Sequence, residues 1–159
     1  MKILSIGDEA PDFCLPDMDG EVLCLNDLKG GYAVIYFYPR DGTPGCTRQA
    51  KEFSANLPRF HEIGVRVLGI SPDSIKSHKK FAEKNDLSVK LLSDEERGVV
   101  EAYGAWQEKS MYGKSFLGVV RSTFIIDPKG KIVSLWPKVR VPGHIEEIFS
   151  TLETLMNER

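Results

Sequence analysis

The chain has 159 residues, of which 42% are hydrophobic and 28% charged, and its formal net charge is -2 at pH 7. This is the composition of a globular protein long enough to form one domain over 1–159, and it gives no electrostatic reason to expect nucleic acid or a membrane as a partner. No segment approaches the ~20 apolar residues of a membrane span, and the apolar run at the start is too short for a signal peptide, so we expect the cytoplasm.

The first predicted element is a β-hairpin within "DFCLPDMDGEVLCL" (12–25), whose two short strands meet at the turn 17–20. The next is "YAVIYFY" (32–38), which lacks clean polar alternation and is therefore expected to be a strand covered on both faces. Further strands are expected at 65–71, 89–93, 119–127 and 131–136. The Asp-Pro-Lys-Gly sequence between the last two predicts another hairpin.

Helical patterns lie between these strands. Apolar residues at spacings of three and four predict a helix that begins near Cys46, with an apolar stripe of Ala50, Phe53, Leu57 and Phe60. Pro58 interrupts this stripe, so we expect a kink or a restart there, with Asn56 as a new cap. Shorter helices are expected at 73–85 and 94–104, and a last helix with a clear apolar face from Ile145 to Met156.

The order of these elements favours an α/β fold with a central mixed sheet flanked by helices. The segment "AWQEKSMYGKSFLG" (105–118) is the least regular part of the chain and is expected to be a loop, either functional or an ordinary crossover. His61, His78 and His144 are expected on or near polar helix faces, and we assign them no role.

Cys46 stands in the first turn of its predicted helix, behind Thr43 and Pro44. Thr is a good N-cap and Pro suits the first helical position. Because a helix N-terminus favours an anion, this position favours the thiolate form of Cys46. The alternative is a buried cysteine that acts as a small hydrophobe.

A reactive thiolate also needs groups that position a substrate and stabilise charge on the leaving atom. Thr43 can present its hydroxyl to the same space, and Pro39 ends the preceding strand and could form an apolar lid. Arg121 interrupts an otherwise apolar predicted strand, where a charge is costly without a partner. Its alternative is an edge-strand arginine that faces water.

The sequence "YPRDGTPGCT" matches the peroxiredoxin active-site pattern of Pro, three residues, Thr, two residues and Cys. Nearly the whole chain resembles the peroxiredoxin subgroup named after bacterioferritin comigratory protein, through segments such as "GDEAPDFCLPDMDG", "VLGISPDS", "FAEKNDLSVKLLSDEE" and "RSTFIIDPKGKI". The resemblance implies a thioredoxin-like fold, no cofactor and no metal. It also implies a thiol-dependent peroxidase that reduces hydrogen peroxide and organic hydroperoxides and serves antioxidant defence.

The resemblance also implies roles for individual residues. Cys46 would be the peroxidatic nucleophile, Thr43 would hydrogen-bond the peroxide and Pro39 would shield the site. Arg121 would hold the thiolate and the polarised peroxide oxygen, and Gln49 would help to hold Arg121. The electrons would come from an external thiol reductant such as thioredoxin or a glutaredoxin-like protein, and the peroxidase would be a monomer or a homodimer.

The chain departs from this subgroup in its resolving cysteine. Many members carry one five residues after the peroxidatic cysteine, where this chain has Lys51, and the next predicted helix also lacks one. The remaining cysteines, Cys14 and Cys24, are expected within about one residue of register on facing strands, close enough to approach disulfide distance. The three cysteines are odd in number and include no Cys-x-x-Cys pair, so we expect free thiols in a reducing compartment.

Two interpretations of Cys14 and Cys24 stay open: half-buried core cysteines, or thiols with a redox role. Our hypothesis is that neither directly resolves Cys46. Two rival functions also stay open, a disulfide reductase or monothiol glutaredoxin-like enzyme and a non-catalytic binding module. The first usually has a second cysteine where Thr43 stands, and the second leaves Thr43, Cys46 and Arg121 unexplained as a set.

Overall fold

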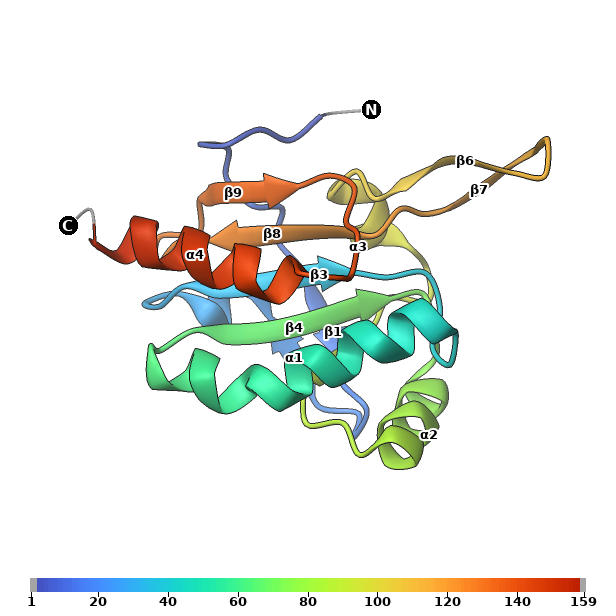
Figure 1. The fold of residues 1–159 in the computed structure, drawn as a ribbon, viewed down its shortest axis with the longest axis horizontal. Coiled ribbons are helices and arrows are strands. Elements are labelled where there is room, and N and C mark those ends of the chain that lie inside the picture. The colour runs from blue at the N-terminus through green and yellow to red at the C-terminus, as the bar shows by residue number, and fades with distance from the viewer. Residues whose placement is uncertain (1–2, 158–159) are drawn as a thin grey trace.

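Strand β3 (Ala33–Phe37) is the centre of the molecule, and all five of its residues are buried. In the computed structural model, which describes residues 3–157, it lies in a five-stranded sheet of order β5-β4-β3-β8-β9. The other strands are β4 (Arg66–Ser71), β5 (Lys90–Ser93), β8 (Ser122–Ile126) and β9 (Ile132–Trp136). Parallel pairing joins β3 to β4 and β4 to β5, and antiparallel pairing joins β3 to β8 and β8 to β9. The predicted mixed sheet is confirmed (Figure 1).

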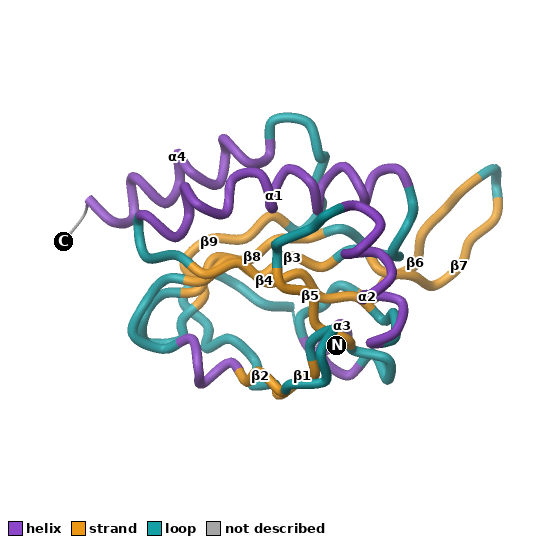
Figure 2. Tube along the Cα trace, turned by 90° about the horizontal axis from the view of Figure 1, so that it is seen from below, coloured by secondary structure: helices purple, strands orange, loops and turns teal. Residues whose placement is uncertain are grey.

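Helices cover both faces of this sheet. Helices α1 (Pro44–Glu62) and α4 (His144–Asn157) lie side by side on one face, and α3 (Gly98–Ala102) lies with strands β1 and β2 on the other (Figure 2). Helix α2 (Ile75–Asn85) packs beside β5 at the edge of the sheet. Among residues 3–157, none of the helices has the length and apolar character that a membrane crossing requires.

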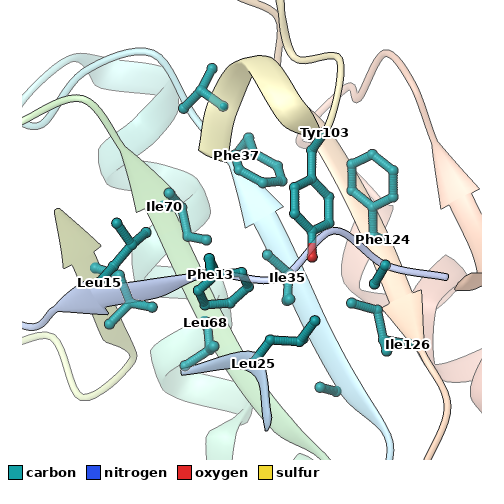
Figure 3. Close-up of a cluster of buried hydrophobic side chains, with 14 of the residues drawn as sticks. Phe13, Leu15, Leu25, Ile35, Phe37, Leu68, Ile70, Tyr103, Phe124 and Ile126 are labelled. Atoms are coloured by element: carbon teal, nitrogen blue, oxygen red, sulfur yellow. The ribbon is translucent and has the colours of Figure 1, made fainter. Parts of the chain in front are cut away.

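Two apolar clusters fill the space on the two faces of the sheet. Because side chains alternate along a strand, β3 sends Ile35 and Phe37 into one cluster and Val34 and Tyr36 into the other. Figure 3 shows the first cluster, where Phe37 and Phe124 from the sheet meet Tyr103. The second cluster includes Cys46, which belongs to α1. Cys46 therefore lies on the face of the sheet that α1 covers.

Helix α1 runs without interruption over 19 residues, so the predicted restart at Pro58 is wrong. Asn56 does not cap a second helix, because its side-chain amide donates to the carbonyl of Glu52 at 2.8 Å. Pro58 has no N–H to donate to the carbonyl of Ser54, four residues earlier. The hydroxyl of Ser88, from the loop before β5, donates to that carbonyl instead at 3.3 Å. A donor distant in sequence thus satisfies the carbonyl that Pro58 leaves free.

The predicted N-terminal hairpin is confirmed. Its strands are β1 (Cys14–Pro16) and β2 (Val22–Cys24), and a short 3-10 helix η1 (Leu25–Leu28) follows. Cys14 and Cys24 lie directly opposite each other, with Cα atoms 4.0 Å apart, and form a disulfide. The expectation of three free thiols is therefore wrong for this pair. The disulfide closes a loop with a sequence separation of 10, and such a loop stabilises the fold by about 3 kcal/mol in the chain-entropy account.

The segment predicted to be an irregular loop is a second hairpin, which projects from the body of the molecule (Figure 1). Strands β6 (Trp106–Met111) and β7 (Lys114–Val119) pair in antiparallel register. Tyr112 and Gly113 at its tip both have positive φ, 53° and 77°, as a tight hairpin turn requires. Most of its side chains are exposed, so the sequence shows no buried face. The loop prediction was wrong for that reason.

The helix predicted at 94–104 is confined to α3, which begins at Gly98. The carboxylate of Asp94 accepts hydrogen bonds from the backbone N–H groups of Val99 and Val100, at 3.0 and 2.7 Å. These two bonds occupy the free donors at the start of α3, so residue 94 caps the helix from outside it.

His144 is buried at the start of α4, so the prediction that it lies on a polar helix face is wrong. Its Nε2 lies 2.9 Å from the hydroxyl of Thr123 on β8, and its Nδ1 lies 3.2 Å from a carboxylate oxygen of Glu147. Burial lowers the pKa of His144 below 6.5, although the bond and charge of Glu147 partly oppose this effect. The folded protein therefore favours neutral His144.

We predict that replacing His144 changes how stability depends on pH. Because its pKa is lowered in the folded state, the unfolded chain takes up a proton first as the pH falls below about 6.5. The free energy of unfolding should therefore fall between pH 7.5 and 5.5 more steeply in the wild type than in His144→Gln. Urea unfolding at several pH values measures this slope, and His61→Gln, at an exposed position, should keep the wild-type slope. Equal slopes in wild type and His144→Gln would contradict the prediction.

Candidate active site

Cys46 lies in the first turn of α1, as the sequence predicts. Thr43 is the N-cap residue with extended backbone angles, and Pro44 opens the helix. The first helical hydrogen bond runs from the N–H of Thr47 to the carbonyl of Thr43 at 2.9 Å. Cys46 is 1% exposed and has a free thiol. A buried thiol in the first turn of a long helix is thus placed where an anion is favoured.

The side chain of Thr43 does not cap the helix, although the residue occupies the N-cap position. Its hydroxyl donates instead to the carbonyl of Arg40 at 2.9 Å. The expectation of a side-chain cap is therefore wrong. The bond to Arg40 fixes the hydroxyl on the loop 39–43 and leaves its oxygen able to accept a further hydrogen bond.

Arg121 lies in the short link between β7 and β8, so it does not interrupt a strand as predicted. Its Nη2 donates to Sγ of Cys46 at 3.4 Å, and its Nη1 donates to Oε1 of Gln49 at 2.6 Å. The alternative of an arginine that faces water is wrong, because the guanidinium points at α1. Gly45 leaves room for it, since a Cβ at that position would lie 3.1 Å from Nη2 of Arg121.

The structure therefore brings three predicted site residues, Cys46, Gln49 and Arg121, into direct contact. The other two, Pro39 and Thr43, lie on the loop that connects β3 to α1, and both are partly buried. Pro39 directly follows the last buried residue of the β3 segment, Tyr38, and directs the chain out of the sheet. All five residues thus belong to two chain segments that meet at the N-terminus of α1.

Lys109 is a charged residue near this site that sequence reasoning missed. It lies on β6, and its ammonium group donates to the carbonyl of Val119 at 2.9 Å. Burial lowers the pKa of Lys109, and the positive charge of Arg121 lowers it further, whereas the charge of a Cys46 thiolate opposes both. Because this segment was predicted to be an irregular loop, there was no reason in the sequence to expect Lys109 near Cys46.

His78 and Asp41 form a buried pair that sequence reasoning also missed. Nδ1 of His78 lies 2.7 Å from Oδ2 of Asp41, and their side chains are 0% and 4% exposed. Nε2 of His78 lies 3.0 Å from the carbonyl of Leu92 on β5, and because that oxygen only accepts, Nε2 carries a proton. The hydroxyl of Tyr38 donates to the other oxygen of Asp41 at 2.6 Å. His78 thus connects the loop 39–43 to the edge of the sheet.

Asp73 extends this network. Its Oδ2 accepts from the backbone N–H of Asp41 at 2.8 Å and from the hydroxyl of Ser71 at 2.7 Å. Ligand atoms of Asp41, Asp73 and His78 lie within 4.8 Å of one another, which is the spacing of a metal site. Hydrogen bonds with each other and with the backbone account for these groups, so we interpret them as a network that holds the loop.

We predict that His78→Gln loosens the loop before Cys46. Asp41 would lose its buried partner, and breaking such a pair costs about 3 kcal/mol of unfolding free energy. The thiol of Cys46 should then react with iodoacetamide about tenfold faster or more, because the loop opens more easily. His61→Gln on the exposed side of α1 is the control and should change neither quantity. Wild-type stability and labelling rate in His78→Gln would show that the pair does not hold the loop.

The chain is similar to several known proteins. A model of the AhpC/TSA family matches residues 6–135. Peroxiredoxin Bcp of Bacillus subtilis is 43% identical over 152 residues, which are 96% of this chain and 97% of that protein. The bacterioferritin comigratory protein of Xanthomonas campestris superposes with a TM-score of 0.84. It is 40% identical, with 89% of this chain and 90% of that chain covered. Its structures, of a trapped intermediate and ligand complexes, were solved to study its alkyl peroxide reduction activity.

A second solved structure covers more of the chain. A cysteine-to-serine mutant of PrxQ from Xylella fastidiosa superposes with a TM-score of 0.92 at 36% identity, covering 98% of this chain and 99% of that chain. The similarity thus extends over both hairpins and all the helices rather than over the cysteine segment alone.

Proposed function

This chain belongs to the AhpC/TSA family and is a thiol-dependent peroxidase of the bacterioferritin comigratory protein subgroup of peroxiredoxins, and from this we propose that Cys46 is its peroxidatic residue. The observation that carries the proposal is the 3.4 Å contact between Nη2 of Arg121 and Sγ of Cys46. A guanidinium carries its positive charge at any pH of interest, so Arg121 lies where it can stabilise negative charge on the sulfur and on the peroxide oxygens during the reaction. A substrate peroxide and a thiol reductant follow from the family.

The reaction proposed for Cys46 is attack by its sulfur on one peroxide oxygen. An S–O bond forms, the O–O bond breaks, and the leaving oxygen takes up a proton and departs as water or alcohol. Sulfur is left as a sulfenic acid. Arg121 borders the thiolate and, in this proposal, stabilises the charge that develops on the oxygens, while Gln49 holds its other nitrogen at 2.6 Å.

Thr43 and Pro39 complete the proposed site. Thr43 would accept a hydrogen bond from the hydroperoxide, because its own proton is already donated to the carbonyl of Arg40. Pro39 would exclude water from one side of the loop. The supporting observation for both is their position on the loop 39–43, which Asp41 and His78 hold in place.

We propose that an external thiol resolves the sulfenic acid, with thioredoxin or a glutaredoxin-like protein as the reductant. Lys51 stands on the exposed side of α1, at the position where the family resemblance leads us to expect a resolving cysteine. Cys14 and Cys24 are bonded to each other and lie on the opposite face of the sheet from α1 (Figure 2). This supports the hypothesis that neither resolves Cys46 of the same chain. We further propose one domain over 1–159, a monomer or homodimer, and a cytoplasmic location where thiols are kept reduced.

The two rival functions are set aside. A disulfide reductase or a non-catalytic binding module would not be a peroxidase. The chain is instead similar to a peroxiredoxin over 96% of its length, at 43% identity.

We predict that Arg121→Gln lowers kcat/KM for hydrogen peroxide by about 100-fold or more, because it removes one preorganised donor to the reacting atoms. Stopped-flow measurement of peroxide consumption with thioredoxin, its reductase and NADPH gives this value. Cys46→Ser should abolish turnover. Arg140→Gln, at an exposed position, is the matched control and should leave the rate unchanged. A rate for Arg121→Gln within twofold of the wild type would contradict the proposed role.

We also predict that the protein with its Cys14–Cys24 disulfide intact gains one oxygen after one equivalent of hydrogen peroxide. Intact mass would show the gain, and a sulfenic-acid reagent would trap it at Cys46. The variant Cys14→Ser with Cys24→Ser should turn over peroxide with thioredoxin at the wild-type rate, because both cysteines lie outside the reaction. A disulfide that joins Cys46 to Cys14 or Cys24 in a peptide map would overturn the proposed external resolution.

A further inference from the structure

We propose that the Cys14–Cys24 disulfide is a second thiol–disulfide exchange site, separate from Cys46, and that its substrate is a protein dithiol of the thioredoxin type. The pair lies at the outer side of the β1–β2 hairpin. Leu15 and Leu23, the next residues on the two strands, point into the core and are 9% and 8% exposed. Because side chains alternate along a strand, Cys14 and Cys24 point the other way, and Cys14 is exposed.

A surface groove leads to the sulfur atoms. It has a volume of about 420 Å³ and is lined by Asp12, Phe13, Cys14, Cys24, Asn26 and Asp27. Exchange requires a thiolate to approach one sulfur of the disulfide, so access is the first condition for reduction. Cys46, which is 1% exposed, does not meet that condition in the folded protein.

The hairpin is also anchored by contacts that do not involve sulfur. The N–H of Leu25 donates to the carbonyl of Phe13 at 2.9 Å, and the hydroxyl of Tyr103 donates to the carbonyl of Pro11 at 2.7 Å. At the other end of the hairpin, Nζ of Lys90 forms an ion pair with Oδ2 of Asp17 at 3.2 Å. None of these bonds involves a sulfur atom, so opening the disulfide removes none of them. Reduction therefore needs no unfolding of the hairpin.

The two sulfur sites lie on opposite faces of the central sheet. The hairpin packs against the cluster that includes Leu15, Leu25 and Tyr103, whereas Cys46 belongs to the cluster under α1 and α4 (Figures 2 and 3). One face of the chain thus reacts with peroxide and the other with dithiols, and each site works without the other.

The exchange is balanced in atoms and electrons. A thiolate of the reductant attacks the exposed sulfur of Cys14, the S–S bond breaks, and Cys24 leaves as a thiolate and takes up a proton. The second thiol of the reductant then attacks the mixed disulfide and releases Cys14. The reductant ends as a disulfide, and this chain gains two electrons and two protons. The same steps in reverse, with an oxidised dithiol protein, restore the Cys14–Cys24 disulfide.

The groove favours a dithiol protein over a small anionic thiol. Among residues 3–157, the charged residues that line it are the acids Asp12 and Asp27, with no Lys or Arg. Glutathione carries a net negative charge and is repelled there. A monothiol also leaves a mixed disulfide, which a second thiol on the same reductant removes quickly because the step is intramolecular. In the reducing compartment proposed above, a disulfide that persists is usually catalytic or redox-sensing rather than a permanent crosslink.

The test uses Cys46→Ser, which lacks the peroxidatic thiol, so its outcome does not depend on the proposed peroxidase mechanism. Folded Cys46→Ser with catalytic thioredoxin, thioredoxin reductase and NADPH should consume one NADPH per chain and gain two hydrogens by mass. The triple variant Cys14→Ser, Cys24→Ser and Cys46→Ser should consume none. The proposal is overturned if folded Cys46→Ser consumes no NADPH while the same protein, unfolded in guanidinium, gains two hydrogens with dithiothreitol. It is also overturned if the isolated protein has free Cys14 and Cys24 thiols that oxidised thioredoxin does not close.

A second measurement does not require the triple variant to fold. A thioredoxin that lacks its second active-site cysteine should be trapped as a mixed disulfide, and a peptide map should place it on Cys14. Asp12→Asn should raise the rate of reduction by glutathione about two- to fivefold, whereas Glu62→Gln, exposed at the far end of α1, should not change it. A trap on Cys24 alone, or an unchanged glutathione rate in Asp12→Asn, would contradict the geometry proposed here.

Discussion

The contact between Arg121 and Cys46 is the interaction on which the rest of the site depends. It joins residues 75 apart in the sequence. It exists because β8 lies antiparallel beside β3, so the loop that follows β3 and the residue that precedes β8 lie at the same end of the two strands. Gly45 admits the guanidinium, and Gln49 fixes its second nitrogen. The central sheet therefore acts as the frame that brings a helix N-terminus and a remote arginine together.

Electrostatics alone does not make such a thiol fast. A thiol that ionises more easily is also a weaker nucleophile, with a Brønsted slope of about 0.4 to 0.5 for disulfide exchange, so much of the gain in thiolate is lost. Most of the acceleration must come from groups held in place around the reacting atoms. This explains why the loop 39–43 is so heavily bonded, with Tyr38, Asp73 and His78 all attached to Asp41. In the proposed mechanism, these bonds keep Thr43 and Pro39 in position to contact a bound peroxide.

The sequence was sufficient wherever local patterns determine the structure. It predicted the sheet strands and the helix that starts near Cys46. The family resemblance also singled out Cys46, Gln49 and Arg121, which the structure places in contact. The sequence failed where a residue distant in the chain determines the local structure. Ser88 donates a hydrogen bond to the carbonyl that Pro58 leaves free, and Leu92 and Asp41 form hydrogen bonds with His78. It also failed at Tyr112, because a non-glycine residue with positive φ gives little sign of a tight turn.

In the proposed mechanism, burial of Cys46 separates the reaction with peroxide from the reaction with the reductant. A hydroperoxide is small enough to reach a thiol that is 1% exposed, but a protein dithiol is not. The proposed resolution by an external protein therefore requires the first turn of α1 to move. The bonds that oppose this movement are those of Gln49 to Arg121 and of Asp41 to His78. In the proposed mechanism these bonds have two opposing effects. They hold the site in the arrangement that reacts with peroxide, and they limit how often the oxidised site opens to its reductant. The exposed Cys14–Cys24 pair carries no such constraint, because thiol–disulfide exchange needs access to sulfur rather than a buried, preorganised site.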